Sequence, residues 1–409
     1  MARTGLISAI GVIGGYFLRQ SRKRRTMDLV IEKLWKLYAP PKLAGLLSCS
    51  LQIPAGQFLT IAGPSGSGKS TLLRLIAGLE KANRGRIFLS GRDVTDLPPS
   101  QRNFGLLPQR PVLYPHLSVR RNLSIGLEMQ NSRHRPKVAS AEIERRIQEA
   151  IELLGLQELL SRRPHQLSGG EQQRVGLGRL IVRRPAIWLL DEPFAHMDFP
   201  RRMQLKRELH LLWKRFLTTI ITVTHDPVEA VSLGESLAVL VRSRVRQVGE
   251  PLAVLQHPEH RLVAEFLGWP PMNLTDGVLT RTSSETGEGF RFAAADGAFQ
   301  LPVPAELVTR AGEGLPVTAG VRPEDLQLVH IAAPNSSPNA EFWFLPDWVV
   351  RLAEPAPPAW LVTVARGNRL WALWWQGSAP PKPGTVLGLK LPPDKIHWFD
   401  QRRGRRLFP

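Results

Sequence analysis

Hydrophobic and polar residues form two alternating patterns along residues 27–267, and both predict regular structure. Short continuous apolar runs occur at residues 58–62, 186–190 and 217–223. Runs of this length are typical of strands that are buried on both faces of a sheet. Apolar residues also recur at helical spacing, as in residues 72–79. Strands that alternate with helices predict an α/β domain built on a largely parallel sheet.

The pattern changes in residues 268–409, which are rich in proline and in short apolar runs bounded by turn residues. This segment also holds eight of the eleven tryptophans. The pattern predicts a small β-barrel, of the OB-like type. Trp371, Trp374 and Trp375 are candidates either for a ligand site or for the core, and aromatic residues on strands more often belong to the core.

Length and composition limit the possible classes of protein. A chain of 409 residues is long enough for about two to three domains. The single cysteine, Cys49, excludes an internal disulfide framework. No apolar run approaches the ~20 residues that a membrane-spanning helix needs. We therefore expect any membrane role to come through partners.

Positive charge is concentrated at the two ends of the chain. The formal net charge is +19, of which +6 precedes the first acidic residue, Asp28, and +4 comes from the arginines of residues 402–406. Such ends favour contact with anionic lipid headgroups or nucleic acid. Solvated ends in a protein from an arginine-rich genome are an equally good explanation, and the sequence leaves both open.

Residues 1–26 stand apart from the rest of the chain. An apolar stretch at residues 6–18 is followed by a basic run at residues 21–25, the reverse of the order in a signal peptide. Thirteen apolar residues are too few to cross a bilayer. We interpret the segment as an N-terminal extension that arises from a start codon assigned upstream of Met27, with a peripheral membrane anchor as the alternative.

A glycine-rich loop with the pattern G-x-x-x-x-G-K-S lies between the apolar run 58–62 and the helical pattern 72–79. Glycines let backbone N–H groups converge on phosphate oxygens, and the start of the following helix adds its positive end. Lys69 supplies charge to the outer phosphates, and the Ser70 hydroxyl is placed to bind Mg²⁺. The predicted nucleotide-binding residues are Gly63, Pro64, Ser65, Gly66, Ser67, Gly68, Lys69, Ser70 and Thr71.

Acidic and imidazole groups follow two of the predicted strands. Asp191 and Glu192 come directly after the apolar run 186–190, and ligands bind at the carboxyl ends of strands in such sheets. Asp191 is suited to organise Mg²⁺, and Glu192 to activate the attacking water as a general base. His225 follows the run 217–223, where its side chain can reach the γ-phosphate.

A second motif, LSGGEQQ at residues 167–173, opens another predicted helix. Together with the phosphate loop, the Asp-Glu strand and the histidine strand, in this order, it resembles the ABC-type ATPases. The resemblance implies a P-loop NTPase nucleotide-binding domain at residues 27–267 and an OB-like regulatory domain at residues 268–409. It also implies ATP and Mg²⁺ as cofactors.

The resemblance assigns further residues. Gln109 matches the glutamine that touches Mg²⁺ and the attacking water. Asp198 matches the aspartate that communicates across a dimer. Tyr38 matches the aromatic residue that stacks on adenine. The remaining matches are those that close over ATP held by the opposite subunit: Ser168, Gly169 and Gly170. Since one chain then carries halves of two different sites, the resemblance implies a two-fold, head-to-tail dimer.

Residues 113–123 (LYPHLSVRRNL) and 266–273 (FLGWPPMN) are similar to the ATPase subunits of carbohydrate importers of the maltose, glycerol-phosphate and multiple-sugar types. This implies a peripheral protein at the cytoplasmic face of the membrane. Its expected partners are a second copy of itself, two transmembrane permease subunits and, indirectly, an extracytoplasmic solute-binding protein.

Two other functions remain open at this point. The same ATPase could serve sulfate, polyamine or ferric-iron import, because those importers share much of the pattern. A soluble ABC ATPase that acts on ribosomes or nucleic acid is a more remote alternative. The chain has one ATPase cassette and no long coiled-coil insertion, so we expect no nucleic-acid partner.

Overall fold

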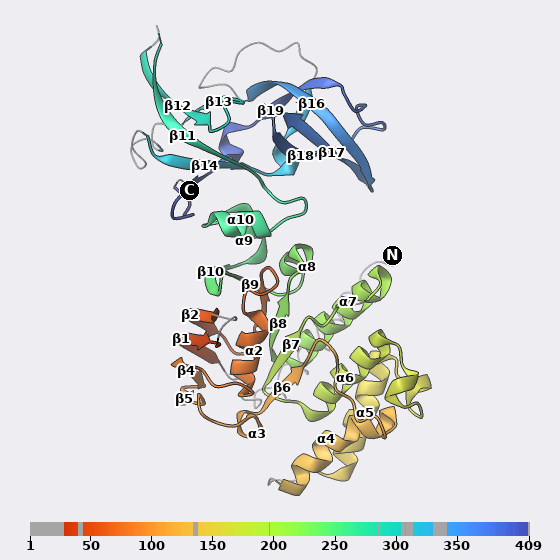
Figure 1. The fold of residues 1–409 in the computed structure, drawn as a ribbon. Coiled ribbons are helices and arrows are strands. Elements are labelled where there is room, and N and C mark those ends of the chain that lie inside the picture. The colour runs from red at the N-terminus through yellow and green to blue at the C-terminus, as the bar shows by residue number, and fades with distance from the viewer. Residues whose placement is uncertain are drawn as a thin grey trace, which may run out of the picture. The chain divides into compact units, whose positions relative to one another are not determined.

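Figure 1 shows the computed structural model of the chain, which describes residues 28–39, 44–133, 138–195, 197–284, 287–303, 307, 314–329 and 342–407. The predicted N-terminal extension, residues 1–26, lies outside this part. By its internal contacts the chain divides into two compact units. The first comprises the chain up to Leu59 together with Gly68–Val223, and the second comprises Thr60–Ser67 together with Thr224–Pro409.

The first unit combines a small antiparallel sheet with parallel strands and most of the long helices (Figure 1). Its strands are β1 (Leu29–Leu37), β2 (Ala44–Ile53), β4 (Arg84–Leu89), β5 (Arg92–Asp93), β6 (Phe104–Leu107), β7 (Ile187–Asp191) and β8 (Thr219–Thr224, the last residue of which belongs to the second unit). Its helices are α2 (Lys69–Ala77), α3 (Pro99–Arg102), α4 (Val119–Arg133), α5 (Ser140–Leu154), α6 (Gly169–Arg183) and α7 (Phe199–Phe216). The antiparallel sheet has the order β2-β1-β4-β5.

The strands β6, β7 and β8 lie side by side and run parallel, with Leu189 opposite Ile221. Every residue of β8 and the first four of β7 are buried, which is why the sequence shows uninterrupted apolar runs there. The predicted run 217–223 begins too early, because Leu217 ends helix α7 in a left-handed conformation with φ 46°. The strand itself starts at Thr219.

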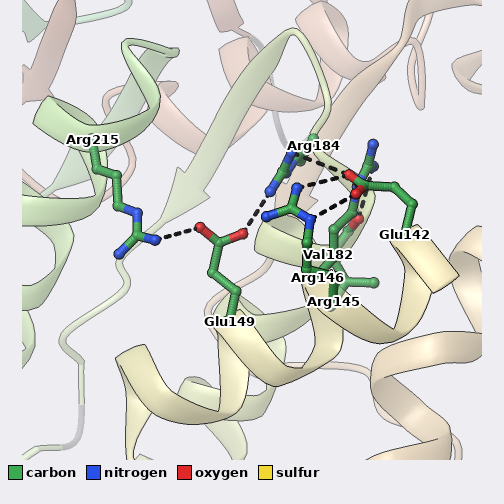
Figure 2. A network of polar contacts seen from close by, with 7 residues as sticks. All are labelled: Glu142, Arg145, Arg146, Glu149, Val182, Arg184 and Arg215. Carbon is green, nitrogen blue, oxygen red and sulfur yellow. Dashed lines mark hydrogen bonds and ion pairs between the residues drawn. The ribbon is translucent and has the colours of Figure 1, made fainter. Parts of the chain in front are cut away.

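Helix α5 is amphipathic, and ion pairs join it to its neighbours (Figure 2). Glu149 accepts a hydrogen bond from Arg184 at 2.5 Å and lies 2.8 Å from a guanidinium nitrogen of Arg215 on α7. Two turns earlier, Glu142 pairs with Arg145 and Arg146 at 2.7 and 2.8 Å. Hydrogen bonds from these two arginines lower the pKa of the Glu142 carboxyl to about 2. The Glu149 contacts fix α5 against α7 and against the segment that leads from α6 into β7.

The second unit contains the end of β3 (Phe58–Ala62) and all elements after β8 (Figure 1). Its helices are α8 (Pro227–Ser232), α9 (Pro251–Gln256) and α10 (Arg261–Phe266). Its other strands are β9 (Ser236–Val241), β10 (Arg244–Gly249), β11 (Asn273–Ser284), β12 (Gly287–Ala294), β13 (Gln300–Pro302), β14 (Pro316–Val321), β15 (Gln327–Val329), β16 (Trp343–Ala356), β17 (Ala359–Arg366), β18 (Arg369–Trp375), β19 (Val386–Leu391) and β20 (His397–Asp400). Among the described residues, no helix is both long and apolar enough to cross a membrane.

From Asn273 onward, the described strands of the second unit form two five-stranded antiparallel sheets, with the orders β13-β12-β11-β14-β20 and β15-β19-β16-β17-β18. Side chains from both sheets share one apolar core. Trp371 belongs to this core and stacks on Trp348, with 4.8 Å between the ring centroids. Trp374 and Trp375 are half-buried. The core explanation therefore holds for Trp371, and its large aromatic area contributes to the stability of the barrel.

Candidate functional site

The phosphate loop links β3 to α2, and two of its glycines are required by close packing. At Gly68 the backbone has φ 102°, and a Cβ there would collide with the carbonyl oxygen of Gly45. At Gly63 a Cβ would lie 3.0 Å from the Ser67 Oγ and collide with the carbonyl of Leu240. Only glycine fits these positions, so the sequence folds this segment into a tight turn whose backbone can approach a ligand.

The polar groups of the loop fit a phosphate ligand. The Ser67 hydroxyl is buried and has no hydrogen-bond partner in the described part of the chain. Lys69, the first residue of α2, is 5% exposed. Burial lowers the pKa of its ammonium group, while the charges of Glu192 and Asp191 oppose that effect. A buried hydroxyl donor and a buried cation are the partners that phosphate oxygens need.

Asp191 and Glu192 stand at the carboxyl end of β7, near the start of α2. The Ser70 Oγ donates to the Asp191 Oδ1 at 2.9 Å. Burial raises the pKa of the Asp191 carboxyl, and the Ser70 hydrogen bond opposes this. The structure thus brings together the hydroxyl and the carboxylate that the sequence predicts for one Mg²⁺ ion, and both are oxygen donors of the kind that Mg²⁺ prefers.

Glu192 has a left-handed backbone conformation, with φ 47°. Its amide donates to the Val223 carbonyl at 3.1 Å, which ties it to β8, and its carbonyl accepts from the Ala195 amide at 3.1 Å. The Gln109 side chain, two residues beyond β6, donates to the Glu192 Oε2 at 3.1 Å. The strained conformation of a non-glycine residue is therefore held by contacts with two neighbouring segments.

Ser168, Gly169 and Gly170 form the start of α6. Ser168 is its N-cap: the Glu171 carboxylate accepts from the Ser168 amide at 2.6 Å, and the Glu171 amide donates to the Ser168 Oγ at 3.4 Å. Ser168 and Gly169 are exposed. Within the described residues, none of the three has a hydrogen bond to the phosphate loop, Asp191 or Glu192. The structure leaves this helix start open to an external group.

The remaining predicted residues lie in turns. Asp198 caps α7 by accepting from the Arg201 amide at 3.2 Å. His225 is exposed between β8 and α8, where Asp226 caps α8 through the Val228 amide at 2.7 Å. His196, which precedes Asp198 by two residues, lies outside the described residues.

Tyr38, the predicted adenine-stacking residue, has its hydroxyl held by Thr71 of the phosphate loop and by Glu80, which the sequence did not indicate. The hydroxyl donates to the Glu80 Oε2 at 2.6 Å and lies 3.2 Å from the Thr71 Oγ1. Burial and the Glu80 hydrogen bond raise the pKa of the Tyr38 hydroxyl. Glu80 also pairs with Lys36 at 3.5 Å. No local pattern marks Glu80, because its partner Tyr38 lies 42 residues away.

Comparisons with known proteins fit this arrangement. The profile of the ABC transporter family matches residues 46–195, and that of the MalK OB fold domain matches residues 268–326. The sn-glycerol-3-phosphate import ATP-binding protein UgpC of Salmonella choleraesuis (strain SC-B67) is 37% identical over 371 residues, which are 88% of this chain and 94% of that protein. The trehalose/maltose import ATP-binding protein MalK of Thermococcus litoralis is 34% identical over 385 residues, which are 92% of this chain and 98% of that protein.

A solved structure of an ATP-binding cassette is similar to the nucleotide-binding part of the chain. The dimeric, post-hydrolysis ATP-binding cassette MJ0796, bound to ADP and Pi, is similar with a TM-score of 0.50 and 28% identity, over 55% of this chain and 98% of that one. The expected fold class, an ABC-type P-loop domain with a C-terminal OB-like domain, is confirmed. The chain belongs to the ABC transporter family and is an import-type ATP-binding subunit, an ATPase.

Proposed function

We propose that this ATPase drives the import of a carbohydrate through separate membrane permease subunits. The named relatives serve sn-glycerol-3-phosphate and trehalose/maltose import, which supports this substrate class. We place the nucleotide-binding domain at residues 27–267 and the regulatory domain at residues 268–409. The two profile matches fall within these bounds.

The hydrogen bond from Gln109 to Glu192 carries the catalytic part of the proposal. Glu192 acts as the general base for the attacking water, and Gln109 orients its carboxylate. His225 completes the site at the γ-phosphate. The loop from Gly63 to Thr71 binds the phosphates, and Lys69 neutralises their charge in a buried setting where charge is most effective.

Ser70, Asp191 and Gln109 hold Mg²⁺ in this proposal, and the hydrogen bond between Ser70 and Asp191 supports a shared site for the first two. The ion, when bound, neutralises charge on the phosphate oxygens. Binding of Mg²⁺ requires the Asp191 carboxyl to be ionised. Its raised pKa makes the neutral form more accessible without the ion.

Two copies of the chain close the sites together. The exposed N-terminus of α6, with Ser168, Gly169 and Gly170, has the backbone N–H groups and the dipole that attract an anion. It covers ATP bound to the partner copy, while Asp198 communicates across the interface. The dimeric form of the similar cassette MJ0796 supports this arrangement. The dimer works at the cytoplasmic face of the membrane against two permease subunits, which receive solute from an extracytoplasmic binding protein.

The Glu192→Gln variant tests the assignment of the base. We expect ATP hydrolysis to fall by about 10²–10⁴-fold, while ATP binding persists and light scattering detects an ATP-dependent dimer. Glu158→Gln, at an exposed carboxylate, is the matched control. Brisk hydrolysis by Glu192→Gln would refute the assignment.

Uptake measurements test the substrate class. A strain that lacks this gene should lose uptake of one radiolabelled carbohydrate, and the wild-type chain should restore it where Glu192→Gln does not. Loss of sulfate, polyamine or iron uptake instead would overturn the carbohydrate assignment and leave the ATPase assignment standing.

A further inference from the structure

Arginines from two distant stretches of the chain meet at His260, in the second unit. One stretch is the hairpin of β9 and β10, with Arg242 in its turn and Arg244 and Arg246 on β10. The other is the turn after β20, which carries four arginines in residues 402–406. His260 precedes α10 and caps it by accepting from the Leu262 amide at 3.1 Å.

Backbone hydrogen bonds hold the C-terminal turn against this helix start. The Arg261 amide donates to the Gly404 carbonyl at 2.7 Å, and the Arg406 amide donates to the Glu259 carbonyl at 2.9 Å. Gly404 has φ 72°, and a Cβ there would lie 2.8 Å from the His260 Nε2. Since only glycine permits this approach, the placement of the turn is fixed by the backbone and not by flexible side chains.

The hairpin is joined to the same place. Gln247, next to Arg246, donates from its side chain to the His257 carbonyl at 2.9 Å and accepts from the Glu259 amide at 2.9 Å. The residues from His257 to His260 therefore lie between the hairpin and the C-terminal turn. Both arginine-bearing segments are rigidly attached to them.

The charges collected here are not neutralised within the described part of the chain. Arg242, Arg246 and Arg405 form no ion pair there. The carboxylate at the end of β20, Asp400, accepts from the backbone amides of Arg402 and Arg403 at 2.8 and 2.9 Å. It therefore serves the turn and not the guanidinium groups.

Two observations show the resulting excess of positive charge. Burial, and then the charges of Arg246, Arg242 and Arg405, lower the pKa of the His260 imidazole. The Arg246 Nε is buried and has no hydrogen-bond partner among the described residues. Like charges at close range repel, and a buried guanidinium donor without an acceptor carries a desolvation cost. An acceptor with negative charge would relieve both.

We propose that Arg242, Arg246 and Arg405, which we call the His260 cluster, bind a phosphate-type oxyanion. Planar guanidinium groups bind tetrahedral oxyanions through paired N–H donors. The Arg246 Nε is a buried donor without an acceptor in the described part of the chain, while Arg242 and Arg405 are exposed and can turn toward the ligand. His260 is engaged with the Leu262 amide and the Arg403 backbone, so it positions the cluster and does not bind the anion. This site is separate from the phosphate loop.

The anion has two possible sources with the same chemistry: a small phosphate compound or a phospholipid headgroup. The experiment uses the full chain with its nucleotide sites filled by Mg²⁺ and a non-hydrolysable ATP analogue. Inorganic phosphate is titrated calorimetrically at constant ionic strength. In a second arm, vesicles of phosphatidylglycerol are compared with vesicles of phosphatidylcholine in a flotation assay.

Arg405→Gln and Arg246→Gln are the test variants, and Arg351→Gln is the control. Arg351 is an exposed arginine on β16 that is not among the charges acting on His260. We expect each test variant to bind phosphate at least about tenfold more weakly, and the control to bind like the wild type. Arg405 is exposed, so its substitution is not expected to perturb folding, which a thermal melt checks.

The outcomes separate the two sources and the failure of the proposal. Binding of inorganic phosphate that the test variants lose supports a small-molecule site. Binding only to phosphatidylglycerol vesicles, lost in the same variants, supports a headgroup site. The proposal is overturned if neither probe binds, or if Arg351→Gln weakens binding as much as Arg405→Gln.

Discussion

The Gln109 side-chain amide donates a hydrogen bond to the Glu192 carboxylate, with 3.1 Å between Nε2 and Oε2. The two residues follow different strands of the first unit, β6 and β7, which run parallel as neighbours. A loop that moves Gln109 therefore also moves or releases the carboxylate assigned as the general base. Coupling between this loop and catalysis needs no longer pathway than one hydrogen bond.

Removing the Gln109 amide should slow hydrolysis without abolishing ATP binding. In Gln109→Ala, Glu192 loses its orienting donor, and we expect kcat to fall about tenfold to a hundredfold with little change in the Kd for ATP. Gln101→Ala, at an exposed glutamine on α3, is the control. Steady-state ATPase assays and equilibrium nucleotide binding measure the two quantities. An unchanged kcat would show that the hydrogen bond has no catalytic role.

Two glycines of the phosphate loop should respond differently to alanine. Gly66 and Gly68 both have positive φ, at 78° and 102°, but only Gly68 meets a backbone atom, the Gly45 carbonyl oxygen. Each alanine should cost about 1–2 kcal/mol of unfolding free energy through its left-handed conformation. Gly68→Ala should lose about 1–3 kcal/mol more, because the added methyl group displaces the backbone. Urea unfolding measures both, and equal losses would contradict the predicted clash.

Two acidic residues of α5, Glu149 and Glu144, should differ in how much their ion pairs contribute to the free energy of unfolding. The Glu149 side chain is 10% exposed and contacts both Arg184 and Arg215 (Figure 2). Glu149→Gln leaves the largely buried Arg184 guanidinium with only its longer, 3.6 Å contact to the Glu142 carboxylate, and we expect a loss of at most about 3–5 kcal/mol.

Glu144 provides the comparison, because it also pairs with an arginine, Arg120, but its side chain is 55% exposed. Glu144→Gln should lower the free energy of unfolding by less than about 1 kcal/mol. In 1 M salt, most of this loss should disappear, because salt screens the exposed ion pair in the wild type. Denaturant unfolding of both variants is the measurement. Similar losses for Glu149 and Glu144 would refute the role of burial.

Stability should decrease with acid through His397. Burial, followed by the charges of Arg406 and Arg322, lowers the pKa of this imidazole to about 3. Below the ordinary histidine pKa, about 6.5, the unfolded chain takes up a proton that the folded chain does not. Stability is therefore lost as the pH falls from about 6.5 toward 3, by at most about 1.4 kcal/mol per pH unit.

In His397→Gln this contribution should disappear, so the free energy of unfolding should fall less steeply between pH 6.5 and 4.5. His165→Gln, at an exposed histidine, controls for the chemical change itself. Urea unfolding at a series of pH values measures the slopes. Parallel curves for the wild type and His397→Gln would contradict a depressed pKa at His397.

The sequence predicted those elements whose residues are all buried or whose contacts are local. The apolar run 58–62 coincides with β3, because a strand buried on both faces has no polar positions to break the pattern. The serine of LSGGEQQ coincides with the N-cap of α6, because its hydroxyl and Glu171 satisfy the free amides of the helix start. At Leu217 the pattern failed, since an apolar residue ends a helix there instead of starting a strand.

Contacts between distant residues were beyond the reach of such patterns. Tyr38 and Glu80 are 42 positions apart, and Arg184 and Glu149 are 35 apart. The hydrophobic period and the spacing of motifs describe one helix or strand at a time. They do not tell which charged residue of another element will contact that helix or strand. The phosphate loop was accessible because its chemistry lies in adjacent residues, whereas the His260 cluster exists only through the fold.

The uneven distribution of tryptophan has a spectroscopic consequence. Residues 268–409 hold eight of the eleven indoles, and Trp348 and Trp371 are stacked in the core of the β-structure. The longest helices, α4 to α7, all belong to the first unit. Intrinsic fluorescence therefore reports mainly on the C-terminal part, and far-ultraviolet circular dichroism mainly on the ATPase part. Melting curves recorded by the two methods would separate two successive transitions or coincide in one cooperative transition.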